Sequence, residues 1–77
     1  MKFIWEEEDI RAGRMFSKPG NVEAQIIGYH VGSHEEDKWA SVSLVDGMIS
    51  TPTNRAIMAT ALTENGYIPV EFMGREK

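Results

Sequence analysis

Residues 39–49 have the sequence WASVSLVDGMI, and this stretch decides the fold. Apolar residues recur at alternate positions up to Leu44, which is typical of a β-strand with one buried face. Asp46 and Gly47 then interrupt the run. This pair is favoured in two-residue type I′ turns, because both central residues of such a turn need positive φ. The stretch therefore predicts a β-hairpin in which Leu44 faces Ile49 across the turn.

Length and composition predict one small folded domain over residues 1–77. Hydrophobic residues make up 42% of the chain, which is too many for a disordered protein. The absence of cysteine excludes disulfides and thiolate metal sites, and it is compatible with a reducing compartment. One core of this size leaves only ~3–5 kcal/mol of net stability, so dimerisation or a bound partner would help.

Charge and hydropathy disfavour several classes of function. The formal net charge is −4, whereas a general nucleic-acid binder normally has a basic excess. No apolar run approaches the roughly 20 residues of a membrane span. The chain also turns acidic at Glu6, where a secretory signal would need an apolar stretch. We therefore expect a cytoplasmic protein with no membrane partner. The scattered glycines form no phosphate-binding loop, so we expect no cofactor.

Three strands are predicted before the hairpin, and the shortest covers residues 14–16. Residues 2–6 have the alternating pattern of a first strand. Residues 22–31 are the longest strand candidate, but their larger apolar side chains change faces halfway. A bulge near Gly28 would reconcile the two halves, because one inserted residue reverses the facing of every residue after it.

A single α-helix is predicted over about residues 52–64. Thr51 is the expected N-cap, and Pro52 suits the first helical position, where no N–H is needed. Gly66 is expected to end the helix in the left-handed conformation. A last strand follows, and Pro69 requires it to lie at a sheet edge because proline cannot donate to a ladder. The expected apolar stripe of the helix is Ile57, Met58, Ala61 and Leu62.

Together these elements predict an α+β fold: a small, strongly twisted, mainly antiparallel sheet of four or five strands with the helix on one face. The helix would be a crossover that makes the last strand parallel to the return strand of the hairpin. The helix-facing side of the sheet is expected to carry Val42, Leu44, Ile49, Ile68, Val70 and Phe72. The opposite side is expected to carry Trp39, Ser41, Ser43, Val45 and Met48, with Ile27 and Tyr29 nearby.

Two arrangements are open for that opposite side. Either the N-terminal aromatic residues fold over it and close the sheet into a small barrel, or it is a contact surface. Residues 9–16 are similar to the opening of SH3-like small barrels, with an acidic–apolar pair, a turn glycine and a short strand. This resemblance implies the first arrangement.

Other candidate groups favour surface roles. The acidic residues lie in two runs, which are Glu6, Glu7, Glu8 and Asp9, and Glu35, Glu36 and Asp37. Consecutive like charges repel, so the first run predicts a solvated turn or a single helical turn. His30 and His34 straddle a strand end and a loop, so we expect no metal site there. No sequence motif pairs Ser41 or Ser43 with a general base, so we do not expect the protein to be an enzyme.

The function expected from these features is binding of another protein, or of a second copy of the chain, through the uncovered sheet face. Its residues would be Trp39, Ser41, Ser43, Val45, Met48 and Tyr29. One alternative is an acidic inhibitor that mimics nucleic acid, in the style of small accessory proteins of phages and mobile elements. The other is an SH3-like binder of small ligands or nucleic acid. Its stacking residues would be Trp5, Tyr29 and Trp39, with Arg11 and Arg14 as cations.

Overall fold

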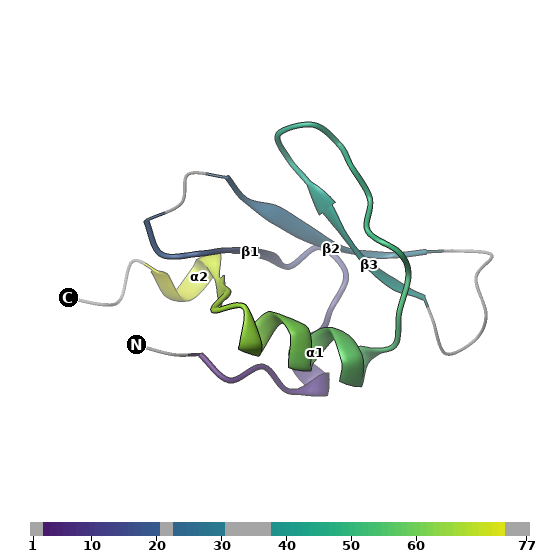
Figure 1. Cartoon of the computed structure of the whole chain (residues 1–77), viewed down its shortest axis with the longest axis horizontal. Coiled ribbons are helices and arrows are strands. Elements are labelled where there is room, and N and C mark those ends of the chain that lie inside the picture. Colours follow the sequence, from purple (N-terminus) through teal and green to yellow (C-terminus); the bar gives the residue numbers. More distant parts are fainter. Residues whose placement is uncertain (1–2, 21–22, 31–37, 74–77) are drawn as a thin grey trace.

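The computed structural model describes residues 3–20, 23–30 and 38–73. Within these ranges four strands form one antiparallel sheet in the order β3-β2-β1-β4, and α1 lies on one side of it (Figure 1). The elements are η1 (Glu7–Asp9), β1 (Met15–Ser17), β2 (Gln25–Tyr29), β3 (Trp39–Ser43), α1 (Arg55–Glu64), β4 (Ile68–Pro69) and α2 (Val70–Met73). The predicted α+β fold is confirmed. The sheet is open, so the barrel arrangement is wrong.

The hairpin is present, but its loop is longer than the predicted two-residue turn. The Ser43 N–H donates to the Met48 carbonyl (2.9 Å), so residues 44–47 form a four-residue loop. Gly47 has a φ of 75°, but no described non-glycine residue has positive φ, which excludes a type I′ turn at Asp46. The Asp46 carboxylate instead accepts a hydrogen bond from the Met48 N–H (2.9 Å). This local bond stabilises the wider loop.

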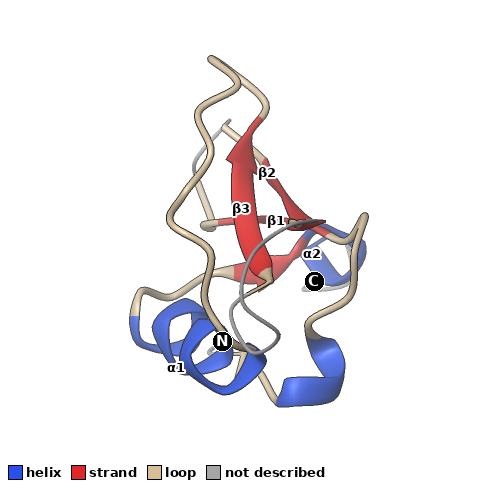
Figure 2. Ribbon diagram, turned by 90° about the vertical axis from the view of Figure 1, so that its right-hand side faces the viewer, coloured by secondary structure: helices blue, strands red, loops and turns tan. Residues whose placement is uncertain are grey.

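The longer loop also changes the register of the hairpin. Ile49 forms an isolated antiparallel bridge with Val42, not with Leu44, so the predicted register is wrong by two residues. The Leu44 N–H donates to the Ala24 carbonyl (3.0 Å), on the far side of β3 from Ile49. β3 ends at Ser43, so Leu44 is the first residue of the loop. Both views place the tip of the hairpin at the end of the molecule away from α1 (Figures 1 and 2).

The end of the hairpin fixes where α1 begins. Thr53 exchanges two backbone hydrogen bonds with Trp39 (2.8 and 2.9 Å) and is therefore still extended. Asn54 follows as the N-cap, and its side chain accepts from the Ile57 N–H (2.8 Å). The predicted N-cap at Thr51 is wrong by three residues. The pairing of Thr53 with β3 overrides the local helix-start signal.

The register between β2 and β3 shows which sheet face α1 covers. Ile27 pairs with Ser41, and Tyr29 pairs with Trp39, so these four residues share a face. Ile27 is 1% exposed and packs in one cluster with residues of α1. The helix therefore covers the Trp39 face, and the predicted facing is inverted.

None of the residues predicted to face the helix from the sheet does so. Val42, Ile49 and Ile68 lie on the other face, Leu44 is in the loop, and Val70 and Phe72 belong to α2. The inversion has a physical reason, since the half-buried indole of Trp39 brings more apolar area to the core than the aliphatic side chains of β3.

β2 pairs with β3 without interruption, from Gln25 with Ser43 to Tyr29 with Trp39. The bulge predicted at Gly28 is therefore wrong. The alternation continues through Gly28 without a change of face, since Ile27 faces the core and Ile26 lies on the opposite face of the sheet. The outer residues of the predicted strand, 22 and 31, lie outside the described ranges.

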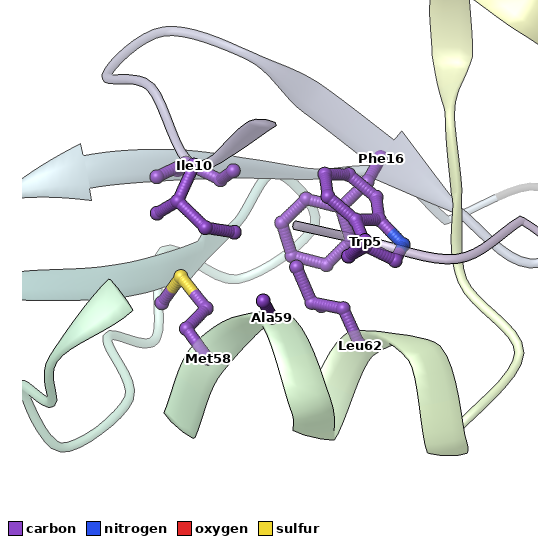
Figure 3. Packing of buried hydrophobic residues seen from close by; sticks show 7 residues of the cluster. Trp5, Ile10, Phe16, Met58, Ala59 and Leu62 are labelled. Atoms are coloured by element: carbon purple, nitrogen blue, oxygen red, sulfur yellow. The ribbon is translucent and has the colours of Figure 1, made fainter. Parts of the chain in front are cut away.

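The core is centred on Trp5, which is 4% exposed. Its backbone N–H donates to the Thr63 hydroxyl (2.8 Å), and its indole N–H donates to the Tyr67 carbonyl (2.9 Å). Because the segment before η1 bonds to α1 and to the chain that follows it, the predicted first strand over residues 2–6 is wrong for its described part. The helical turn predicted over the first acidic run is confirmed as η1. The cluster comprises Trp5, Ile10, Phe16, Ile27, Met58, Ala59 and Leu62 (Figure 3).

The end of α1 agrees with the prediction. Gly66 has a φ of 78° and its N–H donates to the Thr63 carbonyl (3.2 Å), while the Tyr67 N–H donates to the Leu62 carbonyl (3.0 Å). These are the two bonds of a Schellman motif. Met58 and Leu62 of the predicted stripe are buried, whereas Ile57 and Ala61 are exposed and Ala59 is buried in their place.

The last strand is shorter than predicted but lies where Pro69 requires. β4 is an edge strand and pairs only with β1, which confirms the edge position. α2 begins at Val70, so the predicted strand ends after two residues. β4 runs in the same direction as the return segment of the hairpin, as predicted, but the two lie at opposite edges of the sheet.

The two isoleucines at positions 10 and 49 test this division between core and surface. Ile10 is fully buried, so Ile10→Ala should lower the free energy of unfolding by about 2–5 kcal/mol. Ile49 is 60% exposed, and Ile49→Ala should cost less than about 1 kcal/mol. Urea denaturation of dilute protein measures both changes. Equal costs for the two variants would contradict the assignment of the core.

Candidate functional site

The structure separates the predicted binding residues into two groups. Tyr29, Trp39, Ser41 and Ser43 lie on the side of the sheet that α1 partly covers. The remaining two lie in and beside the hairpin loop and are exposed, namely Val45 (65%) and Met48 (69%). The predicted residues therefore do not form one continuous face.

Four apolar side chains form an exposed surface at the end of the hairpin, which we call the apolar arm. They are Leu44 (52% exposed), Val45 (65%), Met48 (69%) and Ile49 (60%). Leu44 and Val45 belong to the four-residue loop, whereas Met48 and Ile49 begin the return segment, in which Ile49 bridges to Val42. The tip of this hairpin lies away from α1 (Figure 2). The sole charge between residues 39 and 54 is Asp46. Large apolar side chains that adjoin one another outside the core are typical of contact sites.

A second apolar surface is a groove of about 220 Å³ between α1 and the sheet, which we call the α1 groove. Its floor contains Phe16, Met58 and Leu62, and its wall on α1 contains Ile57 and Ala61. Uncharged polar residues from the sheet, the return segment and the helix end complete the lining, among them Gln25, Ser41, Ser50, Thr53 and Asn65. No lining residue carries a charge.

Hydrogen bonds already engage part of the polar rim of the α1 groove. The Ser41 N–H donates to the Ser50 hydroxyl (2.9 Å), and the Gln25 amide donates to the Tyr67 hydroxyl (3.4 Å). These bonds hold the polar side chains at the edge and leave the apolar floor open. The α1 groove is therefore suited to an apolar group that carries no charge.

Aromatic rings and cations alternate along the far end of β2 and β3. Tyr29 and Trp39 meet edge to face, with ring centroids 5.0 Å apart. The Lys38 ammonium lies 5.6 Å from the Tyr29 ring, and the Arg55 guanidinium lies 4.5 Å from the Trp39 ring. Sequence reasoning did not place Arg55 here, because its position depends on the pairing of Thr53 with Trp39. The Arg55 contact already occupies the Trp39 ring and limits its use for stacking a ligand.

Arg14 is held inside the molecule and is not a free cation. Its side chain is 8% exposed and bonds to Glu71 (Nε to Oε1, 2.7 Å) and to the Asp9 carbonyl (3.0 Å) and carboxylate (3.4 Å). The guanidinium also lies about 6 Å from the rings of Trp5 and Phe72. Trp5 and Arg14, which the predicted stacking site would need, are thus both part of the folded interior.

The first acidic run lies on the surface around η1. Glu6, Glu7 and Glu8 are exposed beside a shallow, mainly polar cavity of about 510 Å³, and Asp9 is half-buried against Arg14. The second run, Glu35, Glu36 and Asp37, lies outside the described residues, as does His34. Among the side chains that are described, no three His, Asp or Glu gather closely enough to hold a metal ion.

The exposed carboxylates of the first run influence one another. A hydrogen bond between Glu6 and Glu8, together with repulsion between their charges, raises the pKa of Glu6 above its ordinary value. Because the folded chain raises this pKa, it binds the Glu6 proton more tightly than the unfolded chain does. The stabilisation from this group is present at low pH and is lost as pH rises through the raised pKa.

None of the helices in the described ranges has both the length and the apolar character that crossing a membrane requires. In comparisons with known proteins, the chain matches no protein-family model, no curated protein and no solved structure. The apolar arm and the α1 groove are therefore interpreted from their own geometry.

The interaction between Glu6 and Glu8 is tested by two matched variants. Glu8→Gln should lower the pKa of Glu6, because it removes the neighbouring charge and the shared proton. Glu7→Gln changes the same kind of side chain but does not contribute to the shift of Glu6, so it should leave the pKa nearly unchanged. Carboxyl carbon NMR titration measures both. An unchanged Glu6 pKa in Glu8→Gln would rule out this coupling.

Proposed function

We propose that this protein is a non-enzymatic interaction domain that binds another protein through the apolar arm. The observation that carries the proposal is the exposure of four large apolar side chains between positions 44 and 49, on the hairpin loop and the start of its return segment, where hydrogen bonds close the loop. Burying these side chains against a partner would remove their apolar area from water, which is the main source of affinity at protein interfaces.

The shape of the apolar arm favours a protein partner over a small molecule. The tip of the hairpin that carries the arm projects away from α1 (Figure 2), whereas sites for small ligands are concave. Its loop is closed by the Ser43–Met48 and Asp46–Met48 hydrogen bonds, so little backbone freedom would be lost on binding. The carboxylate of Asp46 is the only charged group among residues 44–49, so the remainder of this contact would be uncharged.

Two other functions receive less support. An acidic mimic of nucleic acid needs a large surface of one sign, but Asp9 of the first run is engaged with Arg14. A stacking site for nucleic acid retains Tyr29 and Trp39 with the cations Lys38 and Arg55, but an acidic chain opposes it electrostatically. The proposed site of action is the cytoplasm, on the sole ground that the chain contains no cysteine to stabilise it outside a reducing compartment.

Two variants with matched exposure test the proposed function. Met48→Asp places a charge in the apolar arm, and Ile4→Asp places one on the N-terminal segment; the two native side chains are 69% and 68% exposed. Immobilised wild-type protein and both variants are compared for the proteins they retain from cell extract and for binding of the chain itself. Met48→Asp should weaken binding by about tenfold or more, because it would bury a charge in an apolar contact, whereas Ile4→Asp should bind as wild type does.

Both variants must unfold at the same temperature as the wild-type chain. We expect this because the native side chains of Met48 and Ile4 are largely exposed. If Met48→Asp retained every wild-type partner in equal yield, the apolar arm would not be the binding surface.

A further inference from the structure

We infer that Met48 is the methionine that hydrogen peroxide oxidises first, and that its conversion into the sulfoxide makes the apolar arm polar without disturbing the fold. The assignment of this modification site is independent of the proposed function. The effect of oxidation on binding rests on the proposed function, since it would regulate the same surface.

Met48 is accessible to an oxidant in solution. The chain has five methionines and no cysteine, so thioethers are the sulfur groups that an oxidant can attack. The structure describes the side chains of three of these methionines, and they differ in exposure. Met48 is 69% exposed and Met15 is 38% exposed, whereas Met58 is 6% exposed and packs in the core cluster. Because peroxide must reach the sulfur, Met48 is the most reactive of the three.

The reaction at Met48 needs only hydrogen peroxide. A lone pair of the Met48 sulfur attacks one peroxide oxygen, so that an S–O bond forms while the O–O bond breaks. The proton on the transferred oxygen passes to the departing hydroxide, which leaves as water. The sulfur loses two electrons, the peroxide gains them, and the product is methionine sulfoxide.

The fold does not depend on the side chain of Met48. Its backbone N–H donates to the Asp46 carboxylate (2.9 Å), and its carbonyl accepts from the Ser43 N–H (2.9 Å). Both bonds use backbone atoms of Met48, and the core cluster does not include its side chain. Oxidation of Met48 therefore leaves the loop closed, whereas oxidation of Met58 would place a polar oxygen in the core.

A sulfoxide at Met48 changes the character of the apolar arm. The new oxygen accepts hydrogen bonds, whereas the other side chains of the arm, Leu44, Val45 and Ile49, are exposed hydrocarbon. Burying this oxygen in an apolar contact that offers no donor costs free energy. The exposure that admits peroxide also admits methionine sulfoxide reductases, which restore the thioether. The change is therefore reversible.

Peptide mass spectrometry after brief treatment with hydrogen peroxide tests the assignment of the site. Met48 should form the sulfoxide about tenfold or more faster than Met58, and also faster than Met15. The oxidised chain should elute earlier in hydrophobic-interaction chromatography and keep its unfolding temperature.

Two variants separate Met48 from the other methionines in this experiment. Met48→Leu keeps an apolar side chain but removes the sulfur, so the same peroxide dose should leave its elution unchanged. Met15→Leu is the matched control, since it retains Met48 and should respond as the wild-type chain does. Faster oxidation of Met15 or Met58 than of Met48 would overturn the inference. An unchanged elution, or a lowered unfolding temperature, of chains oxidised only at Met48 would also overturn it.

Binding to cell extract distinguishes this inference from the proposed function. The immobilised chain is treated with peroxide and washed, and the proteins it retains are compared with those of its own untreated sample. Oxidation should reduce retention by the wild-type chain, and a reductase should restore it. If oxidised wild type kept every partner that Met48→Asp loses, the regulation would fail and the proposed function would stand. If Met48→Asp lost no partner although Met48 is oxidised first, the proposed function would fail and the modification site would stand.

Discussion

The hydrogen bond from the Trp5 indole to the Tyr67 carbonyl is the interaction on which the rest of the structure depends. It joins the N-terminal segment to the residue that follows the end of α1, across 62 positions of sequence. The Trp5 backbone bond to Thr63 strengthens the same connection. The indole then packs edge to face against Phe3 and Phe16, so one side chain links the N-terminus, α1 and the sheet. A buried Trp needs such a partner for its N–H, and the end of α1 supplies it.

This arrangement determines which surfaces are left uncovered. α1 has ten residues and shares its buried side with the N-terminal segment, so it cannot cover the whole sheet. The α1 groove is what remains between the helix and the β2–β3 part of the sheet. The side chains of the apolar arm remain exposed, and the tip of the hairpin lies away from α1 (Figure 1). Both features follow from a small core that lies between α1, the N-terminal segment and one face of the sheet.

Predictions from the sequence succeeded where one or two neighbouring residues determine the structure. Gly66 ends the helix and Pro69 selects an edge strand, because backbone freedom and a missing N–H are local properties. The predictions failed where a contact with a residue distant in sequence determines the local structure. The pairing of Thr53 with Trp39 delays the helix, and the bonds of Trp5 to the end of α1 replace a strand.

The candidate site shows the same limit. The exposure of Val45 and Met48 agrees with their predicted place on the surface, although their part in binding is a proposal. Trp39 was predicted to be on the uncovered face, but the register with β2 turns it towards α1. The α1 groove could not be predicted at all, because its lining comes from five separate parts of the chain. Only the packing of those parts creates the space.

The central claim is that the apolar arm is a binding surface and that the core around Trp5 stays unchanged on binding. The most direct measurement is two-dimensional amide NMR of the isotope-labelled wild-type chain, alone, with excess unlabelled chain and with unlabelled cell extract. The account predicts that resonances of residues 44–49 shift or broaden in at least one of the mixtures, and that the Trp5 indole resonance does not. Resonances of the apolar arm that stay constant in every mixture would contradict it.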